Sequence, residues 1–411
     1  MELKELLEKA KKAKYDMAKS TNDLRNKALK NIALKLEEMR DFILETNKID
    51  ILNAHKSNYE ASFIERLTLT ENRIDMLVDS VYKIISLEDY NGKIVEKIQR
   101  PNGLIIEKVL VPFGTLLTIF ESRPNVTVDI SIMSIKTGNT VILKGGKEAI
   151  NTNRCLSSIM REAIKEYINP DSILFIDSID RNITEELLKS NEYIDLLIPR
   201  GSKNLIDYCV KNSKVPFIET GAGNCHLYIH EDADLDMALK IAINAKYSRP
   251  SVCNAIETIL VDKKIAENAL KLIYNSFSNL NIEMRGCDET LKYININKAT
   301  EEDYYKEYND YIIAIKVVED YHEAINHISK YSTKHSETIV TENKNIAAIF
   351  LNEIDSACIY HNASTRFTDG GCFGFGAEIG ISTSKLHARG PMGLKEIMTY
   401  KYKIYGNGEV R

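Results

Sequence analysis

The sequence contains no apolar run long enough to cross a bilayer. Its most apolar stretch, residues 110–120, includes Pro112 and Gly114 and is far shorter than the roughly 20 residues that a membrane helix needs. The first residues alternate charged and apolar side chains and lack the apolar core of a secretory signal. There is no polybasic run, and the net charge is −5. We therefore expect neither a membrane nor a nucleic-acid partner.

Cysteine and histidine show no metal or disulfide pattern. The seven cysteines are scattered without a CxxC pair, which, in a chain without a secretory signal, indicates reduced thiols and a cytoplasmic protein. Among the eight histidines, His322, His327 and His335 are nearest to a cluster, but their spacing does not match a metal site. We expect no bound metal.

The chain is long enough for more than one domain, with 411 residues of which 44% are hydrophobic and 27% charged. Residues 2 to about 90 have helical spacing, with a capping-box pattern at Thr68 and Glu71. From about residue 104, short β-branched runs alternate with helical patterns, which predicts parallel α/β sheets. The expected strands are 104–111, 116–120, 140–143, 172–176, 195–198, 216–218, 226–229, 258–261, 312–318, 338–340 and 358–360.

Two segments predict contacts between subunits. Residues 105–120 form a hairpin pattern that turns at Pro112-Phe113-Gly114, and residues 400–405 alternate as an added strand does. An apolar two-stranded arm is marginally stable in water. We therefore expect the arm and the C-terminal strand to build a homodimer or a higher homo-oligomer.

Three polar loops inside apolar surroundings are candidate sites: residues 121–125, 219–224 and 249–255. Strand ends and the loops that follow them are where α/β sheets build sites. Cys253 lies in a polar loop beside Arg249, where a thiolate nucleophile would be favoured; a buried structural thiol is the alternative. Asn125 could stabilise an oxyanion or merely cap a helix. Glu219 could be a general base or the partner of a buried arginine.

Two strand ends could hold a nucleotide. Lys144 stands at the end of an expected strand beside Gly145 and Gly146, and Gly201-Ser202 follow another such strand. Such positions suit a ribose or phosphate. Glycine turns before helices are common, however, and the G-x-G-x-x-G pattern is absent from both places.

Taken together and in order, five stretches resemble the γ-glutamyl phosphate reductase family of the aldehyde dehydrogenase superfamily. They are VPFGTLLTIFESRPNVTVD, IETGAGNCHLYI, RPSVCNAIET, NASTRFTDGGCFGFGAEIGIST and KLHARGPMGLKEIMTYKY. The resemblance implies an aldehyde dehydrogenase-like α/β fold with two Rossmann-like parallel domains and an oligomerisation β-arm. It also implies NADPH-dependent reduction of L-γ-glutamyl 5-phosphate to L-glutamate 5-semialdehyde with release of phosphate, a step of proline biosynthesis.

The resemblance also implies roles for single residues. Cys253 matches the catalytic cysteine and Asn125 the oxyanion-hole asparagine. Lys144 and Gly201-Ser202 match the cofactor-binding positions. Lys147 stands where the wider superfamily often has a glutamate that favours NAD, and its positive charge suits the 2′-phosphate of NADPH. Glu219, grouped with the cofactor-binding residues, matches the general base of hydrolytic relatives.

The substrate carries anionic groups, for which arginine is the natural partner. Arg249, beside the nucleophile, is the first candidate, and Arg366 and Arg389 are the next; a structural ion pair is the alternative for each. Other functions remain open: another acylating or hydrolytic aldehyde dehydrogenase, or a catalytically idle binding protein of this fold.

The expected domains follow from these assignments. Residues 1–103 and 117–222 form the cofactor-binding domain, and residues 223–360 form the catalytic domain. Residues 104–116 and 385–411 form the oligomerisation arm and C-terminal strand. The kinase that makes the acyl phosphate, glutamate 5-kinase, is expected on another chain and is a candidate for transient contact.

Overall fold

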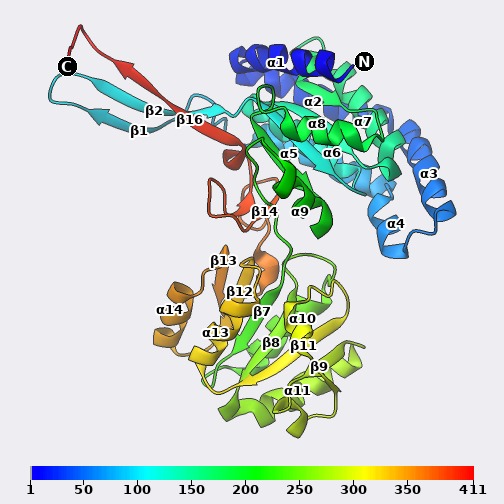
Figure 1. Ribbon diagram of the computed structural model, residues 1–411, viewed down its shortest axis with the longest axis vertical. Coiled ribbons are helices and arrows are strands. Elements are labelled where there is room, and N and C mark those ends of the chain that lie inside the picture. The colour runs from blue at the N-terminus through cyan, green and yellow to red at the C-terminus, as the bar shows by residue number, and fades with distance from the viewer. Residues whose placement is uncertain (1) are drawn as a thin grey trace. The chain divides into compact units, whose positions relative to one another are not determined.

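The structure is a computed structural model that describes residues 2–411 and divides into two compact units. The first unit comprises Met1–Thr220, Gly374–Gly380 and Met392–Arg411, and the second comprises Gly221–Phe373 and Ile381–Pro391. Figure 1 traces the chain from blue at the N-terminus to red at the C-terminus. Each unit is built around its own parallel sheet, which confirms the expected α/β architecture.

The first part of the first unit is helical, as the apolar spacing predicts. Its helices are α1 (Leu3–Lys19), α2 (Asn22–Glu38), α3 (Arg40–Lys56), α4 (Ala61–Leu67) and α5 (Glu71–Ser86). In α1 the buried residues recur every three or four positions and so fall on one face: Leu6, Leu7, Ala10, Ala13 and Met17.

The predicted capping box at Thr68 and Glu71 is wrong. Thr68 follows the last residue of α4, and the N-cap of α5 is Thr70. The Thr70 hydroxyl accepts a hydrogen bond from the backbone N–H of Arg73 at 3.2 Å. The helix therefore begins two residues later than the capping-box pattern indicates, with the same type of capping side chain.

The parallel sheet of the first unit has the strand order β5-β4-β3-β6. Its strands are β3 (Thr115–Phe120), β4 (Thr140–Gly145), β5 (Ile173–Phe175) and β6 (Leu196–Arg200). Between and after them lie α6 (Asn125–Thr137), α7 (Ile150–Ile164), α8 (Arg181–Lys189) and α9 (Lys203–Asn212). Every residue of β3 and β4 is buried, because both faces of this sheet are covered.

One predicted strand of this unit is wrong. Residues 216–218 make only an isolated bridge, between Phe217 and Leu197. Pro216 has no N–H to donate to a ladder, so the pairing does not extend into a strand.

The second unit contains a parallel sheet with the order β10-β9-β11-β8-β7-β12-β13. Its strands are β7 (Cys225–Ile229), β8 (Ile256–Asp262), β9 (Glu283–Gly286), β10 (Asn297–Lys298), β11 (Ile312–Val318), β12 (Ser336–Val340) and β13 (Cys358–His361). Its helices are α10 (Leu235–Tyr247), α11 (Ala266–Asn279), α12 (Glu301–Tyr305), α13 (Tyr321–Tyr331) and α14 (Lys344–Glu353). The edge strand β10 and its neighbour β9 were not predicted, because they are short and carry charged residues.

An antiparallel arm extends from the first unit (Figure 1). It consists of β1 (Ile94–Gln99), β2 (Ile105–Pro112) and β16 (Met398–Tyr405), in the order β1-β2-β16. The predicted hairpin over residues 105–120 is therefore wrong: β2 pairs with β1 and β16, whereas β3 enters the parallel sheet. Residues 94–99, assigned from the sequence to the cofactor-binding domain, form a strand of the arm.

The C-terminal strand exists as predicted, but its partner lies in the same chain. Tyr400 is opposite Leu110, and Ile404 is opposite Ile106. A separate two-stranded sheet is formed by β14 (Gly380–Ser382) and β15 (Gly390–Met392). Short 3₁₀ turns lie at Lys147–Ala149, Pro170–Ser172, Lys263–Ile265, Thr290–Lys292, Thr365–Phe367 and Lys395–Ile397.

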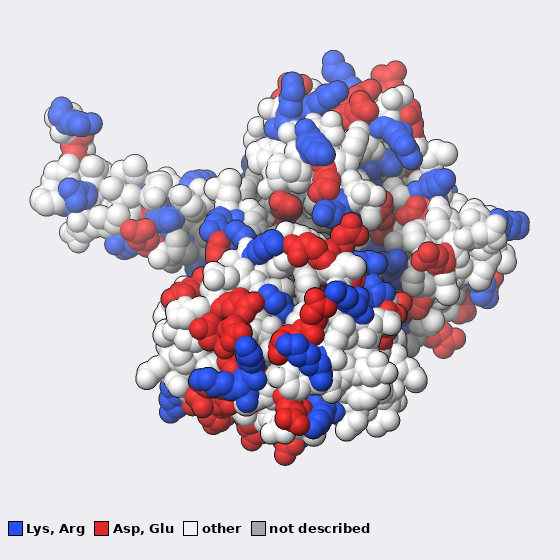
Figure 2. Space-filling model, turned by 60° about the horizontal axis from the view of Figure 1, so that its bottom comes forward, with Lys and Arg blue, Asp and Glu red and all other residues white. Residues whose placement is uncertain are grey.

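The surface carries mixed charge. Figure 2 shows Lys and Arg interspersed with Asp and Glu on the faces in view, while much of the visible arm carries neither. Among the residues that the structure describes, no helix is both long and apolar enough to cross a membrane.

Candidate active site

The candidate nucleophile Cys253 lies in the loop between α10 and β8, in the second unit. The loop turns tightly, because the N–H of Ala255 donates to the carbonyl of Val252 at 3.0 Å. Cys253 is partly exposed, whereas Cys225 and Cys209 are buried. The loop precedes β8, as the sequence indicates, so Cys253 lies at the amino end of that strand.

Residues that follow β13 hold this loop in place. The Asn254 amide donates to the carbonyl of Thr368 at 2.9 Å, and the Asn254 carbonyl accepts from the Thr365 hydroxyl at 2.6 Å. The Arg366 guanidinium donates to the side-chain oxygen of Asn254 and, through Nε, to Ser248 Oγ at 3.1 Å. The candidate nucleophile is therefore flanked by a residue that is anchored through both its main chain and its side chain.

One of the three candidate arginines, Arg366, interacts electrostatically with both Arg249 and Cys253. Burial lowers the pKa of Arg366, the positive charge of Arg249 lowers it further, and the charge of Cys253 opposes both effects. Both arginines are thus within Coulombic reach of the same loop. Positive charge beside a cysteine favours the thiolate, which is the reactive form.

The third candidate, Arg389, is engaged elsewhere in the second unit. Its guanidinium donates to Asp355 Oδ1 at 2.8 Å, and Asp355 also pairs with Lys334 and Lys385. These cations lower the pKa of the Asp355 carboxyl. The structural ion pair that we kept open for each arginine is the observed state of Arg389.

The predicted cofactor positions meet at the carboxyl edge of the sheet in the first unit. Gly145, the last residue of β4, is opposite Phe120 of β3, which is in turn opposite Arg200 of β6. Lys144 and Gly201 therefore stand at the ends of strands that flank β3. Parallel strands end at one edge, so side chains far apart in the sequence gather there.

The side chains at this edge have defined partners. Lys144 is buried, which lowers its pKa, and its ammonium donates to the carbonyl of Gly145 at 3.1 Å. Ser202 caps α9, accepting from the N–H of Leu205 at 3.4 Å, and its own N–H donates to Glu121 Oε2 at 2.9 Å. Lys147 is exposed at the start of a 3₁₀ turn.

Glu219 is half-buried and follows the buried Ile218, one residue before the first unit ends at Thr220. In the sequence it directly precedes the glycine-rich segment that leads into β7.

Asn125 does not cap a helix. It is the first residue of α6, its neighbour Pro124 already has helical torsion angles, and its amide donates to Asp129 Oδ2 at 2.9 Å. Of the two functions that the sequence left open for this amide, capping is therefore excluded.

Asn125 and Asp129 line a recess of about 90 Å³ in the first unit. Its charged lining also includes Arg123, Arg200 and Glu378. Burial raises the pKa of Asp129 to about 6, although the hydrogen bond from Asn125 and the charge of Arg200 act in the opposite direction. Sequence reasoning missed Asp129; its place one helical turn after Asn125 is the signal that could have found it.

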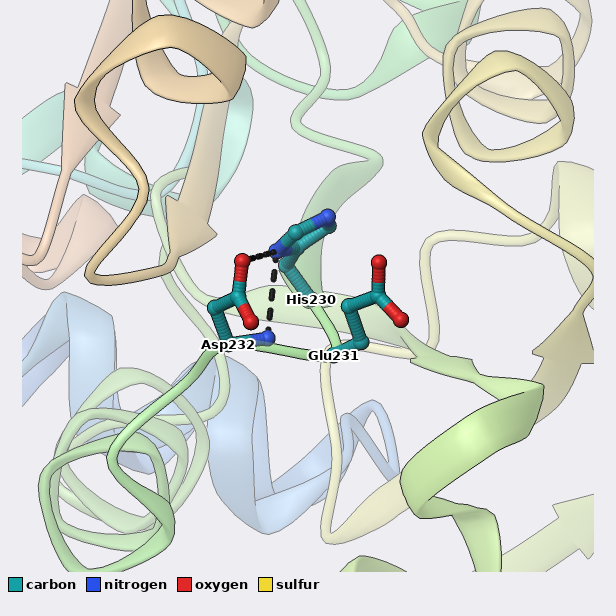
Figure 3. A group of neighbouring side chains, drawn as sticks. All are labelled: His230, Glu231 and Asp232. Carbon is teal, nitrogen blue, oxygen red and sulfur yellow. Dashed lines mark hydrogen bonds and ion pairs between the residues drawn. The ribbon is translucent and has the colours of Figure 1, made fainter.

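One further cluster, His230, Glu231 and Asp232, has the composition of a metal site (Figure 3). Its members have local partners. His230 Nδ1 accepts from the N–H of Asp232 at 3.2 Å, and Glu231 pairs with Lys264. Asp232 accepts a hydrogen bond from Asn343. The imidazole lone pair is thus directed at the backbone of the turn, and we assign the cluster no metal.

Asp129→Asn should reveal the raised pKa as a dependence of stability on pH. The folded protein binds the proton of Asp129 more tightly than the unfolded chain does, so protonation below about pH 6 stabilises the wild type only. Between pH 7 and pH 4.5, the difference in free energy of unfolding between wild type and variant should shift by about 2 kcal/mol in favour of the wild type. Urea unfolding at both pH values measures it, and a constant difference would contradict the raised pKa.

Comparison with known proteins agrees with this arrangement. The model of the aldehyde dehydrogenase family matches residues 1–311. The gamma-glutamyl phosphate reductase of Dictyoglomus thermophilum is 49% identical over 411 residues, which cover 100% of this chain and 99% of that protein. The crystal structure of the gamma-glutamyl phosphate reductase of Thermotoga maritima has a TM-score of 0.98 and 47% identity, and covers 100% of both chains. An engineered glycolyl-CoA reductase with bound NADP+ has the same fold at 13% identity, with a TM-score of 0.68 over 97% of this chain and 96% of its own. The chain therefore belongs to the aldehyde dehydrogenase family, among relatives that are named gamma-glutamyl phosphate reductases.

Proposed function

We propose that this chain catalyses the NADPH-dependent reduction of L-γ-glutamyl 5-phosphate to L-glutamate 5-semialdehyde, with release of phosphate. The observation that carries the proposal is a partly exposed cysteine on an anchored loop beside two arginines, in a chain that is 49% identical over its full length to a relative of that name. The reaction is a step of proline biosynthesis.

The chemistry follows from these groups. The Cys253 thiolate attacks the acyl carbon, phosphate leaves with its electron pair, and a thioester remains on the sulfur. We propose Arg249 and Arg366 as the partners of the leaving phosphate, because a guanidinium fork matches its oxygens. We propose Asn125 as a donor to the oxyanion, since only one of its two amide hydrogens is needed for Asp129.

The residues at the carboxyl edge of the first sheet fit a dinucleotide. The buried ammonium of Lys144 donates to the Gly145 carbonyl, which leaves further N–H donors for ribose hydroxyls. The exposed Gly201 presents main chain beside the start of α9, where a phosphate is favoured. When bound, the cofactor supplies the hydride that reduces the thioester.

The recess beside Asn125 suits the amino-acid end of the substrate. It contains carboxylates at Asp129 and Glu378 and guanidinium groups at Arg123 and Arg200. An α-ammonium and an α-carboxylate require both signs of charge. Arg389 is the weakest of the arginine candidates, because Asp355 already occupies it.

Cys253→Ala should lower turnover by at least about 10³-fold, because the acyl group loses its nucleophile. The assay is phosphate-dependent reduction of NADP with glutamate 5-semialdehyde as substrate. Cys209→Ala is the matched control, since it removes a buried thiol from the core of the first unit. A Cys253→Ala enzyme with near-normal turnover would refute the thioester route.

Lys147→Glu should shift the cofactor preference from NADPH towards NADH. The exposed ammonium of Lys147 can pair with a 2′-phosphate, whereas a carboxylate repels that phosphate and accepts from a ribose hydroxyl. The ratio of kcat/KM for the two cofactors should fall by about tenfold or more, as one lost charge pair of 1–2 kcal/mol implies. Lys211→Glu, an exposed change on α9, should leave the ratio unaltered.

We propose that the arm mediates a homo-oligomer. Apolar and aromatic side chains on it are half exposed or more, including Tyr400, Tyr402 and Ile404. Exposed apolar surface of this kind marks an interface. Two-fold symmetry is the commonest closed arrangement, so a dimer is the simplest form.

Replacing Tyr402 and Ile404 together by Lys should produce a monomer, because desolvating two charges in an apolar interface is costly. Light scattering at micromolar concentration measures the mass. Ile179→Lys, at a site that is 67% exposed, is the control and should leave the assembly unchanged. A wild-type monomer, or an arm variant that keeps the wild-type mass, would rule out an oligomer built through the arm.

A further inference from the structure

A fully buried thiol contacts the main chain of the candidate nucleophile. Cys225 is the first residue of β7, with none of its surface exposed. Its Sγ donates a hydrogen bond to the main-chain carbonyl oxygen of Cys253 at 3.2 Å. The two cysteines are 28 residues apart in the sequence, and the parallel pairing of β7 with β8 brings their loops together.

The main chain just before Cys225 touches the same carbonyl group. A Cβ atom on Gly223 would lie 1.5 Å from the Cys253 carbonyl oxygen and 2.3 Å from its carbonyl carbon. Both distances are far inside van der Waals contact, and the obstacle is backbone rather than a flexible side chain. Only glycine at position 223 allows the Cys253 peptide group to occupy its observed place.

The Cys225 thiol is held in the form that donates. Burial and the nearby Glu337 carboxylate raise its pKa well above the usual range, so it stays protonated. Its other neighbour, His335 Nδ1 at 3.7 Å, belongs to a fully buried ring whose pKa burial lowers to about 4. A neutral imidazole leaves the thiol proton in place.

His335 is itself fixed by a chain of buried hydroxyls. Its Nδ1 lies 2.9 Å from Ser336 Oγ, which lies 2.7 Å from Thr368 Oγ1. The carbonyl of Thr368 accepts from the Asn254 amide, which closes the circuit back to the nucleophile loop. These hydrogen-bonded groups next to the loop therefore hold one another in a fixed orientation.

We infer that Cys225 and Gly223 are positioning residues for the nucleophile: the thiol donor and the glycine contact together fix the carbonyl of Cys253. This inference rests on the proposed role of Cys253. Fixing that carbonyl sets the torsion angle between the Cys253 Cα and its peptide, and with it the direction of Sγ. A displacement of about 1 Å at a reacting atom can lower a rate by about 100-fold.

A purely structural role for Cys225 and a donor role predict opposite orders of the variants in kcat. If the thiol only fills space, Cys225→Ala is tolerated better than Cys225→Ser, because serine brings a hydroxyl into the core. If the thiol acts as a donor, Cys225→Ser retains the function that Cys225→Ala removes. The order of the two variants in kcat therefore separates the roles.

The experiment measures kcat and KM for phosphate-dependent reduction of NADP with glutamate 5-semialdehyde, together with alkylation of Cys253 by iodoacetamide in the free enzyme. We expect Cys225→Ala to lower kcat by about tenfold at a KM within about twofold of wild type, and to slow alkylation of Cys253. Cys225→Ser should recover most of the loss. If Cys225→Ala does not fold, Cys225→Val replaces it as the variant that fills the space without a donor.

Two further variants distinguish the possible failures. Cys253→Ala must be inactive; if it is active, the proposed nucleophile is wrong and the role of Cys225 falls with it. If Cys253→Ala is inactive while Cys225→Ala or Cys225→Val keeps wild-type kcat and alkylation, the positioning role alone is refuted. A Cys225→Ser enzyme slower than Cys225→Ala also refutes it. Cys209→Ala, an equally buried thiol in the first unit, should match wild type in both measurements.

Discussion

Complete burial of the parallel strands is the constraint on which the rest of the structure depends. Every residue of β3, β4, β7 and β8 is buried. Strands of this kind satisfy their backbone through pairing and have no face for solvent-exposed polar groups. Polar chemistry is thereby confined to the edges of each sheet, where the loops begin and end.

The candidate site residues lie at opposite ends of the parallel strands in the two units. In the first unit, Lys144 and Gly201 stand at carboxyl ends, where oriented main-chain groups favour an anionic ligand. In the second unit, Cys253 precedes its strand and lies at the amino end. There the loop has no helix beginning at it, and it depends on neighbours for its shape: Gly223 and Cys225 below it, and Thr365 and Thr368 beside it.

Burial also sets the protonation of the groups near these edges. It raises the pKa of Asp129 to about 6 and that of Cys225 well above the usual range, and it lowers the pKa of Lys144. Each shift favours the neutral form, because burial removes the water that would solvate the charged form. Burial lowers the pKa of Arg366 as well, but a guanidinium starts from so high a pKa that it stays protonated beside Cys253. Charge is thus retained where an anionic substrate has to bind.

The sequence by itself determined the α/β class, the helical first layer, nearly all of the central strands and the loop that carries Cys253. These are local properties: apolar spacing reports which face of a helix or strand is buried, and ordered motifs report the family. The tertiary structure decided what local patterns cannot specify. It showed that β2 pairs with β1 and β16 rather than with β3. It also showed that Arg389 pairs with Asp355 and that the Asn125 amide donates to Asp129. It also brought Gly223 and Cys225 against a carbonyl far along the chain. Contacts of this kind depend on which strands become neighbours, and strand order is fixed by the packing of the whole sheet rather than by any segment of the sequence.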